Sequence, residues 1–374
     1  RCFVNEHRWF WQPGRVLLTS IRKGAQNWPL SQVCASWTGA AVLMSAKVVS
    51  AVLLALAFVA LWRSQTPIAP ESIQLPFPGE HVSIASLDFH HPRFSLLFPM
   101  SNYNGFADIQ NLFSEREYAF FHATLLTVLA RMKSQDRTQT SSCRVLDLGM
   151  NVGYTALLSH SLGCEVEGVE ANPKTHAYLT ENIRLNGAQK RIVANRAAVS
   201  RSSLRGSHVP FRVDGSGLTA HVDLSFVGAG GEGVVQVPVV NSVGARFTEP
   251  IMMKIDVEGF EFSALLAARH VLGRVPVILF EWDPERMRLR DGADSAALYL
   301  KTLRDAGYEI LHYHGSPAAD EELLAPGFVE GDVLAVLKRF GPKRFGHQLN
   351  VQYQELIKAI EEKKRGKQAY TITS

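Results

Sequence analysis

One stretch of the sequence, VLDLGMNVGYTALLSHSLGCEVEGVEANP at residues 145–173, constrains the fold more than any other. An apolar run leads into a loop with spaced glycines, then into a segment with helical periodicity, and then into a second apolar run that ends in an acid. This order is typical of a βαβ unit, in which a crossover helix joins two parallel strands. We therefore expect a nucleotide-like ligand to bind where the first strand meets the helix.

The alternation of strand and helix continues beyond this unit and sets the fold class. It predicts an α/β fold with a doubly wound, mostly parallel sheet that helices cover on both faces. Residues 203–240 interrupt the alternation with two short β-prone runs around a glycine-rich segment, which we interpret as an inserted hairpin. Strands are expected at 144–148, 165–170, 191–199, 251–257, 275–281, 308–313 and 332–338, and helices at 114–132, 154–162, 173–186, 260–272 and 294–306.

Residues 38–62 are apolar almost throughout and are long enough to span a bilayer as a helix. Five basic residues and one acid precede them, so the positive-inside rule places the N-terminus in the cytosol and the rest of the chain across the membrane, in the lumen of the secretory pathway. A cleaved signal or a plastid or mitochondrial transit segment is the alternative. The expected organisation is a basic segment at 1–37, a candidate transmembrane signal anchor at 38–62, a Pro-rich stalk and lead-in at 63–100, the main α/β domain at 101–340, and a tail with a surface helix at 341–374.

The glycine loop itself indicates which nucleotide binds. In the dinucleotide fingerprint G-x-G-x-x-G, the corresponding positions here are Gly149, Asn151 and Tyr154, and a tyrosine in place of the third glycine fits NAD or FAD poorly. Asn tolerates a positive φ, so the loop can still turn tightly. S-adenosylmethionine fits better, because it has a ribose, no phosphates, and a sulfonium that favours nearby carboxylates. The residues that we expect to bind it are Asp147, Gly149, Asn151, Gly153, Tyr154, Glu170 at the end of the second strand as the ribose acid, and Asn172.

Acids that follow a later strand are the candidate catalytic residues. In IMMKIDVEG, period-two alternation places Lys254, Asp256 and Glu258 on one side of a strand that should lie beside the first. Asp256 and Glu258 could orient an acceptor hydroxyl and take its proton. Glu281, at the end of ILFEW, is the third candidate. In the alternative interpretation, Lys254 and Asp256 form an ion pair and Glu258 and Glu261 are first-turn acids of a helix; we prefer this interpretation for Glu261 only.

The segments VLDLGMNVGY, VEANP, IMMKIDVEGFEFSALLAARHVL and ILFEW together resemble the FkbM-type S-adenosylmethionine-dependent methyltransferases, over about residues 110–340. The resemblance implies a seven-strand, Rossmann-like class I methyltransferase fold and O-methylation, often of a sugar or natural-product hydroxyl. It also implies that Asp147 to Tyr154 form the cofactor loop, that Glu170 is the ribose acid, and that Lys254, Asp256, Glu258 and Glu261 form the downstream motif. Where the family often has an acid before this motif, the chain reads VPVVNSVGARF.

Several other functions are disfavoured. IDVEGFE replaces the Asn/Asp-Pro-Pro-aromatic run of base methyltransferases, and a net charge of +4 does not indicate a nucleic-acid surface. A nicotinamide-dependent oxidoreductase and a non-catalytic cofactor-binding or interaction module are the rival hypotheses. We expect a small-molecule or glycan acceptor, a membrane contact through the N-terminal helix, no nucleic-acid partner and no metal. Cys143 and Cys164 precede two neighbouring strands and could pair, but we expect free thiols.

Overall fold

A computed structural model of the chain describes residues 82–87, 94–99, 116–135, 143–199, 208–213, 220–222, 234–247, 249–328 and 331–365. All of these residues belong to one unit, Ile68–Ser374. The basic segment 1–37 and the candidate anchor 38–62 lie outside the described residues. Within the described part of the chain, no helix is both long enough and apolar enough to cross a membrane.

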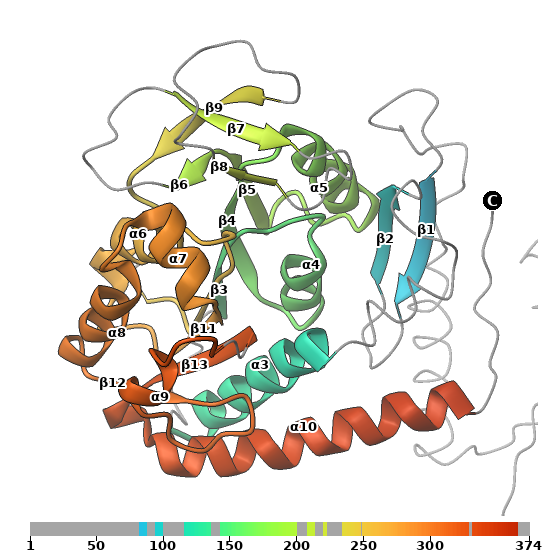
Figure 1. Ribbon diagram of the computed structural model, residues 1–374. Helices are drawn as coiled ribbons and strands as arrows, with labels where there is room; N and C mark the ends of the chain where they lie inside the picture. The colour runs from blue at the N-terminus through green and yellow to red at the C-terminus, as the bar shows by residue number, and fades with distance from the viewer. Residues whose placement is uncertain are drawn as a thin grey trace, which may run out of the picture. The chain divides into compact units, whose positions relative to one another are not determined.

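A seven-stranded sheet forms the centre of this unit (Figure 1). Its strand order is β12-β13-β11-β10-β3-β4-β5, and β13 alone pairs antiparallel with its neighbours. This order, with one reversed strand, is the class I methyltransferase arrangement, as expected. The strands are β3 (Arg144–Leu148), β4 (Glu165–Glu170), β5 (Ile192–Arg196), β10 (Met252–Ile255), β11 (Val277–Trp282), β12 (Tyr308–Leu311) and β13 (Gly331–Leu337).

Helices cover both faces of the sheet, with α4 and α5 on one side and α6, α7 and α8 on the other (Figure 1). Burial on both faces explains why the central strands are nearly continuous apolar runs rather than alternating ones. The helices are α3 (Arg116–Gln135), α4 (Tyr154–Ser161), α5 (Pro173–Leu185), α6 (Glu261–Ala267), α7 (Pro284–Asp291), α8 (Ser295–Asp305), α9 (Asp320–Leu323) and α10 (Pro342–Arg365).

The chain order reverses between β3 and β10, and this switch point determines where a ligand can bind. From β3 the sheet continues through β4 and β5 on one side, whereas β10 and β11 lie on the other. The loops that leave β3 and β10 therefore part in opposite directions and leave a crevice beyond the carboxyl ends of the strands. The prediction that the strand carrying Lys254 lies beside the first strand is confirmed, since Lys254 is opposite Asp147 in the register.

Three of the departures from the sequence-based expectation concern β10, β5 and α7. The strand predicted at 251–257 ends at Ile255, because the chain turns immediately afterwards. The strand predicted at 191–199 is divided between β5 and β6 (Ala198–Val199). Helix α7 was not predicted, although Asp283 caps it by accepting a hydrogen bond from the Arg286 N–H (2.9 Å) and Pro284 occupies its first turn.

The folded unit extends beyond 101–340 in both directions. Strands β1 (Val82–Leu87) and β2 (Phe94–Pro99) form an antiparallel hairpin within the segment that we assigned to the stalk and lead-in. The side-chain amide of Asn182 on α5 accepts from Leu97 N–H (2.6 Å) and donates to Leu97 C=O (2.9 Å), which fixes β2 against the domain. At the other end, α10 packs along α3 and buries the side chains of Phe345, Leu349 and Tyr353.

The inserted region is a small sheet rather than a hairpin alone. β6, β7 (His208–Val213), β8 (Ala220–Val222) and β9 (Val234–Val240) form a four-stranded sheet in the order β6-β9-β7-β8. It has its own apolar cluster, formed by Ala198, Val209, Phe211 and Val237. This sheet lies at the top of the domain in Figure 1, beyond the carboxyl ends of β4 and β5.

The expectation of two free thiols is wrong, because Cys143 and Cys164 form a disulfide. The two cysteines immediately precede β3 and β4, which pair in parallel with Arg144 opposite Glu165. This register places the two cysteines side by side, with their Cα atoms 4.5 Å apart. The disulfide therefore joins the amino-terminal ends of the two strands whose carboxyl-terminal ends carry the glycine loop and Glu170.

Candidate cofactor and active site

A solvent-open cavity of about 670 Å³ lies at the switch point of the sheet. This volume includes space that is open to solvent. The glycine loop, the end of β4, the inserted sheet and the turn after β10 all contribute to its wall. The lining residues are Gly149, Asn151, Val169, Glu170, Ala171, Asn172, Ala197, Ala198, Val199, Phe211, Asp256, Val257, Glu258 and Phe260.

The glycine loop turns through three residues with positive φ: Gly149 (91°), Asn151 (51°) and Gly153 (97°). The prediction that Asn151 adopts a left-handed conformation is confirmed. Gly149 is required for a second reason, since a Cβ atom at this position would lie 1.7 Å from the main-chain oxygen of Asp256. The two sequence motifs of the chain, the glycine loop and the segment after β10, are therefore in direct main-chain contact.

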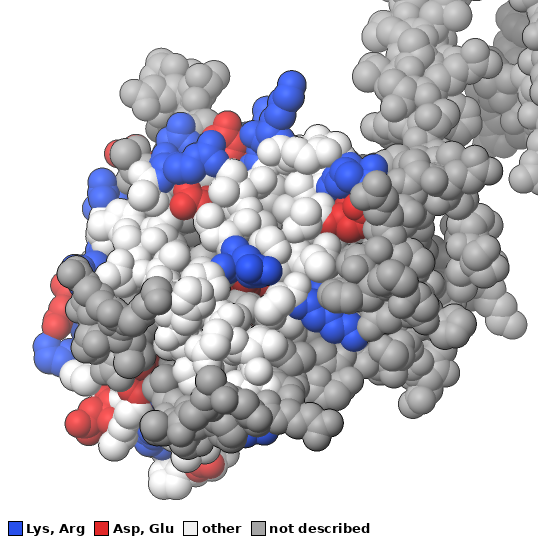
Figure 2. All heavy atoms as spheres, turned by 90° about the horizontal axis from the view of Figure 1, so that it is seen from above, with Lys and Arg blue, Asp and Glu red and all other residues white. Residues whose placement is uncertain are grey.

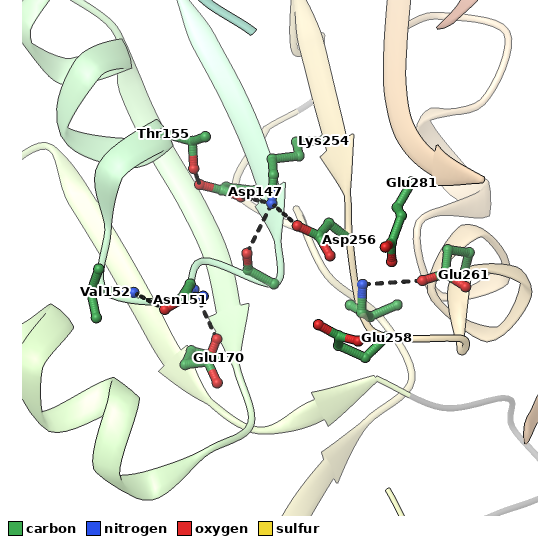
Figure 3. Close-up of polar contacts among 12 residues, drawn as sticks. Asp147, Asn151, Val152, Thr155, Glu170, Lys254, Asp256, Glu258, Glu261 and Glu281 are labelled. Atoms are coloured by element: carbon green, nitrogen blue, oxygen red, sulfur yellow. Dashed lines mark hydrogen bonds and ion pairs between the residues drawn. The ribbon is translucent and has the colours of Figure 1, made fainter. Parts of the chain in front are cut away.

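Glu170 lies in the cavity at the end of β4, as predicted (Figure 3). Its two carboxylate oxygens accept hydrogen bonds from the N–H groups of Asn151 and Asn172, each at 2.8 Å. Burial raises the pKa of Glu170 to about 7, although these two N–H groups act in the opposite direction. Asn172 caps α5 by accepting from Lys174 N–H (3.0 Å), which fixes the chain where it leaves β4.

Asp147, Gly153 and Tyr154, which we also predicted to bind the cofactor, are not among the residues that line the cavity. Asp147 is buried beneath the loop, where its Oδ2 accepts a hydrogen bond from the Thr155 hydroxyl (2.5 Å) and burial raises its pKa. Tyr154 is buried in the core, at the first position of α4. These three residues lie beneath the glycine loop or at the start of α4, where they support the loop without lining the cavity.

Lys254 connects the glycine loop to the acids (Figure 3). Its ammonium donates to Gly149 C=O (3.1 Å) and Asp256 Oδ2 (3.0 Å), and lies 3.9 Å from Asp147 Oδ1. Burial alone would lower the pKa of Lys254, but Asp256 and Asp147 raise it above its ordinary value. The ion pair between Lys254 and Asp256 is thus present, and it holds Asp256 at the cavity wall with 40% of its side chain exposed.

Glu258 also lines the cavity, but its backbone conformation differs from the one expected. It does not continue the alternation of β10, which ends at Ile255, but lies in the following turn with a left-handed φ of 58°. Its Oε2 accepts a hydrogen bond from Arg286 Nη1 (2.8 Å). Burial and the neighbouring charge of Asp256 raise the pKa of Glu258, whereas Arg286 and Arg290 lower it.

Glu281 and Glu261 lie behind the wall and do not line the cavity. Both carboxylate oxygens of Glu281 lie 3.2 Å from Arg286 Nη1, and burial together with the charges of Asp256 and Glu261 raises its pKa to about 9. Glu261 is buried at the start of α6 and accepts from Gly259 N–H (3.0 Å) and Val257 N–H (3.3 Å). This is the structural role that we preferred for Glu261.

The sequence did not identify Arg286, Arg290 or Phe211 as residues of the site. The two arginines lie on the unpredicted helix α7, whose Asp-Pro start at Asp283 was the available signal. Phe211 comes from β7 of the inserted sheet, and no local pattern indicates which of its side chains faces the cavity.

The described part of the chain has no evident metal centre, and the face shown in Figure 2 has no single basic patch. The described residues contain no group of three or more His, Cys, Asp or Glu side chains that could hold a metal ion. Seen from above, Lys and Arg side chains lie scattered over the face shown in Figure 2, and uncharged surface separates them. The expectation that the chain does not bind nucleic acid stays a prediction.

The family model that matches residues 147–310 is described as the methyltransferase FkbM domain. Residues 147–310, somewhat less than half of the chain, are thus similar to the FkbM-type methyltransferases. The match begins at Asp147 and includes every acid of the site described above. It confirms the resemblance that the glycine loop and the segment after β10 indicated, and it places the cavity in the domain that defines the family.

Solved structures with a similar fold include three other methyltransferases. The human methyltransferase 10 domain containing protein is 10% identical, with 65% of this chain and 89% of that chain covered and a TM-score of 0.34. The precorrin-6y C5,15-methyltransferase from Geobacter metallireducens GS-15 is 12% identical, with 57% of this chain and 87% of that chain covered and a TM-score of 0.28. The N-terminal domain of human METTL16 in complex with SAH is 12% identical, with 56% of this chain and 66% of that chain covered and a TM-score of 0.30. No protein with a curated description matches the chain.

Proposed function

We propose that this methyltransferase domain transfers a methyl group from S-adenosylmethionine to a hydroxyl group of a sugar or other small molecule. The charge of the cavity carries the proposal. Three carboxylates, those of Glu170, Asp256 and Glu258, line it, and no Lys or Arg is among its described lining residues. Such a wall suits a cationic nucleoside without phosphates and disfavours a dinucleotide, whose pyrophosphate would need compensating donors or positive charge.

The residues of the cavity fit the parts of this cofactor. The Glu170 carboxylate accepts one main-chain hydrogen bond at each oxygen and can accept further bonds from a ribose diol. Bound S-adenosylmethionine supplies an activated methyl group on a positively charged sulfur. Asp256 and Glu258 add negative charge on the opposite part of the wall, where this charge favours a cation.

Asp256 and Glu258 are also the residues proposed to handle the acceptor. When a hydroxyl oxygen is methylated it loses its proton, and a carboxylate at the cavity wall can orient the hydroxyl and take that proton. Lys254 holds one oxygen of Asp256, so the rest of this carboxylate remains available to an acceptor. Asp256→Asn should therefore slow turnover and leave binding of S-adenosylhomocysteine, which lacks the positive charge on sulfur, little changed. Positioning of the cofactor and the acceptor in the cavity would contribute the rest of the rate acceleration.

The test is an equilibrium titration of the chain with S-adenosylmethionine, in which Glu170→Gln is compared with Glu165→Gln. Glu165 begins the same strand at the end remote from the cavity, and 46% of its side chain is exposed. We expect Glu170→Gln to weaken binding at least tenfold and Glu165→Gln to leave it unchanged. Equal affinities for the two variants would remove Glu170 from the site.

The location of the domain is proposed on separate grounds. We propose that residues 38–62 anchor the chain in a membrane and that the domain lies on the oxidising, lumenal side. The apolar character of 38–62 and the excess of basic residues before it support the anchor. The disulfide between Cys143 and Cys164 supports an oxidising compartment. Deletion of 38–62 should release the expressed protein from alkali-washed membranes; a full chain that is already released by the wash would contradict the anchor.

A further inference from the structure

The turn that carries Glu258 adopts a conformation that its own sequence does not favour. Among the described residues, Asn151 and Glu258 are the two non-glycine residues with positive φ. Asn tolerates this conformation, whereas Glu has no side-chain property that favours it. A strained residue at a candidate active site persists only if surrounding contacts hold it there.

Two arginines of α7 supply those contacts, one to the side chain of Glu258 and one to its main chain. Arg286 Nη1 donates to Glu258 Oε2 (2.8 Å), and Arg290 Nη1 donates to the Glu258 main-chain oxygen. The helix also lies directly against the next residue, Gly259, because a Cβ there would come within 2.8 Å of Arg290 Cδ and 2.9 Å of Arg286 Cγ. Helix α7 therefore holds the turn by both charge and packing.

Arg286 is itself fixed by two further acids. Its Nε lies 3.0 Å from Asp283 Oδ2, and its Nη1 lies 3.2 Å from each carboxylate oxygen of Glu281. A planar guanidinium can bond several carboxylates in one fixed geometry, which a single ammonium group cannot do. The side chain of Arg286 is 31% exposed. An isolated pair at this exposure would contribute little, but a network of three acids around one guanidinium restricts its geometry.

We propose that Arg286 and Arg290 are positioning residues, which hold Glu258 in its left-handed conformation with its carboxylate at the cavity wall. The proposal deepens and rests on the proposed function, because Glu258 matters only if the cavity binds the acceptor. Arg286 acts through the Glu258 side chain, and Arg290 acts through the Glu258 carbonyl. Neither arginine lines the cavity.

Amide hydrogen exchange of the turn tests the proposal without an acceptor. Glu261 protects the N–H groups of Val257 and Gly259, so a peptide covering 256–262 reports opening of the turn. We expect Arg286→Gln to speed exchange of this peptide about tenfold, the ratio expected from loss of one charge-assisted hydrogen bond. Arg286→Lys should give an intermediate rate. Arg288→Gln is the matched control, since Arg288 lies on the same helix but donates to Leu324 C=O (3.2 Å).

A second background separates positioning from simple support of α7. In Glu258→Gly, residue 258 adopts φ of 58° without strain. Arg286 loses the carboxylate of residue 258 in this variant and keeps its contacts with Asp283 and Glu281. We expect Arg286→Gln to change exchange less than twofold in this background, whereas Arg290→Gln should still speed it, because the carbonyl remains. Equal acceleration by Arg286→Gln in both backgrounds, or no acceleration in either, would overturn the proposal.

Titration with S-adenosylhomocysteine keeps this result distinct from the proposed function. We expect Arg286→Gln to bind it within about threefold of the unsubstituted chain, because the ribose end of the cavity, at Glu170, is formed by other elements. Failure of the unsubstituted chain to bind would count against the proposed function. A loss of binding in Arg286→Gln alone would show that α7 supports the whole cavity and would overturn the assignment of a local positioning role.

Discussion

Gly149→Ala and Gly163→Ala form a matched pair that tests whether the two motifs of the site are in contact. Gly149 follows β3 with φ of 91°, and Gly163 precedes β4 with φ of 89°. Alanine is strained by about 1–2 kcal/mol at either position. The lower entropy of the unfolded chain offsets about 0.4–1 kcal/mol of this cost. The surroundings differ, because a Cβ at Gly163 meets nothing within 4 Å, whereas one at Gly149 lies 1.7 Å from the Asp256 oxygen.

This clash sets the size of the expected difference. The Asp256 carbonyl would have to move by at least 1.3 Å, because Cβ contacts shorter than 3.0 Å are essentially absent from proteins. Such a movement breaks the hydrogen bond from Asp256 N–H to Leu148 C=O (2.9 Å), which contributes about 1 kcal/mol, and adds an overpacking cost of about 1–3 kcal/mol. We expect Gly163→Ala to lower the free energy of unfolding by about 1 kcal/mol and Gly149→Ala by about 3–5 kcal/mol.

Urea unfolding measures the free energy of unfolding of each variant. Because alanine at a positive φ costs about the same at both positions, this cost cancels in the difference between the two variants. Gly149→Ala should also weaken cofactor binding, since it displaces the loop from the turn that carries Asp256, whereas Gly163→Ala should not. If the two substitutions cost the same within about 0.5 kcal/mol, the close contact between Gly149 and Asp256 does not exist in solution.

Three further predictions concern titration and the disulfide. Because burial raises the pKa of Glu170 to about 7, binding of S-adenosylmethionine should weaken by up to about tenfold per pH unit below pH 7, and Glu170→Gln, measured by the same titration, should bind weakly without this slope. The pKa of Glu281 rises from 4.5 to about 9 on folding, so the folded state binds a proton that the unfolded chain releases. The contribution of Glu281 to stability is therefore largest below about pH 4.5 and falls between about pH 4.5 and 9. In urea unfolding across this pH range, the free energy of unfolding of Glu281→Gln should fall with pH by up to about 1.4 kcal/mol per pH unit less than that of the unsubstituted chain. Equal slopes in the two proteins would contradict the raised pKa. Reduction of the disulfide, which closes a loop of 21 residues, should lower stability by about 2–4 kcal/mol in urea unfolding, and a reductant should have no effect on the variant with both Cys143 and Cys164 replaced by Ala.

The parts of the site that were predictable from the sequence depend on short-range patterns. Strand β3, the glycine loop, α4 and β4 occupy fewer than 30 consecutive residues, and each has a local signal in its periodicity, its glycines or its terminal acid. The positions of Gly149, Asn151 and Glu170 in one cavity follow from this unit alone. The contact between β3 and β10 was predictable from the order of strands in a doubly wound sheet.

The parts that were missed depend on long-range contacts. Glu258 departs from the strand alternation because α7, about 30 residues later, packs on the turn and bonds both its side chain and its carbonyl. Asp147 has a role beneath the loop because Lys254 and Thr155 reach it from other elements. The sequence placed Cys143 and Cys164 before two neighbouring strands, but the pairing also depends on the register of β3 on β4, which the local pattern does not give.

The most direct test of the account is a calorimetric titration of the same chain with S-adenosylmethionine, S-adenosylhomocysteine and NAD. A cavity lined by Glu170, Asp256 and Glu258, without a described basic residue, should bind the first two at micromolar concentrations and should not bind NAD. Binding of NAD alone would contradict the interpretation of the glycine loop and of the cavity charge. Absence of binding by all three ligands would contradict the claim that this cavity is a cofactor site.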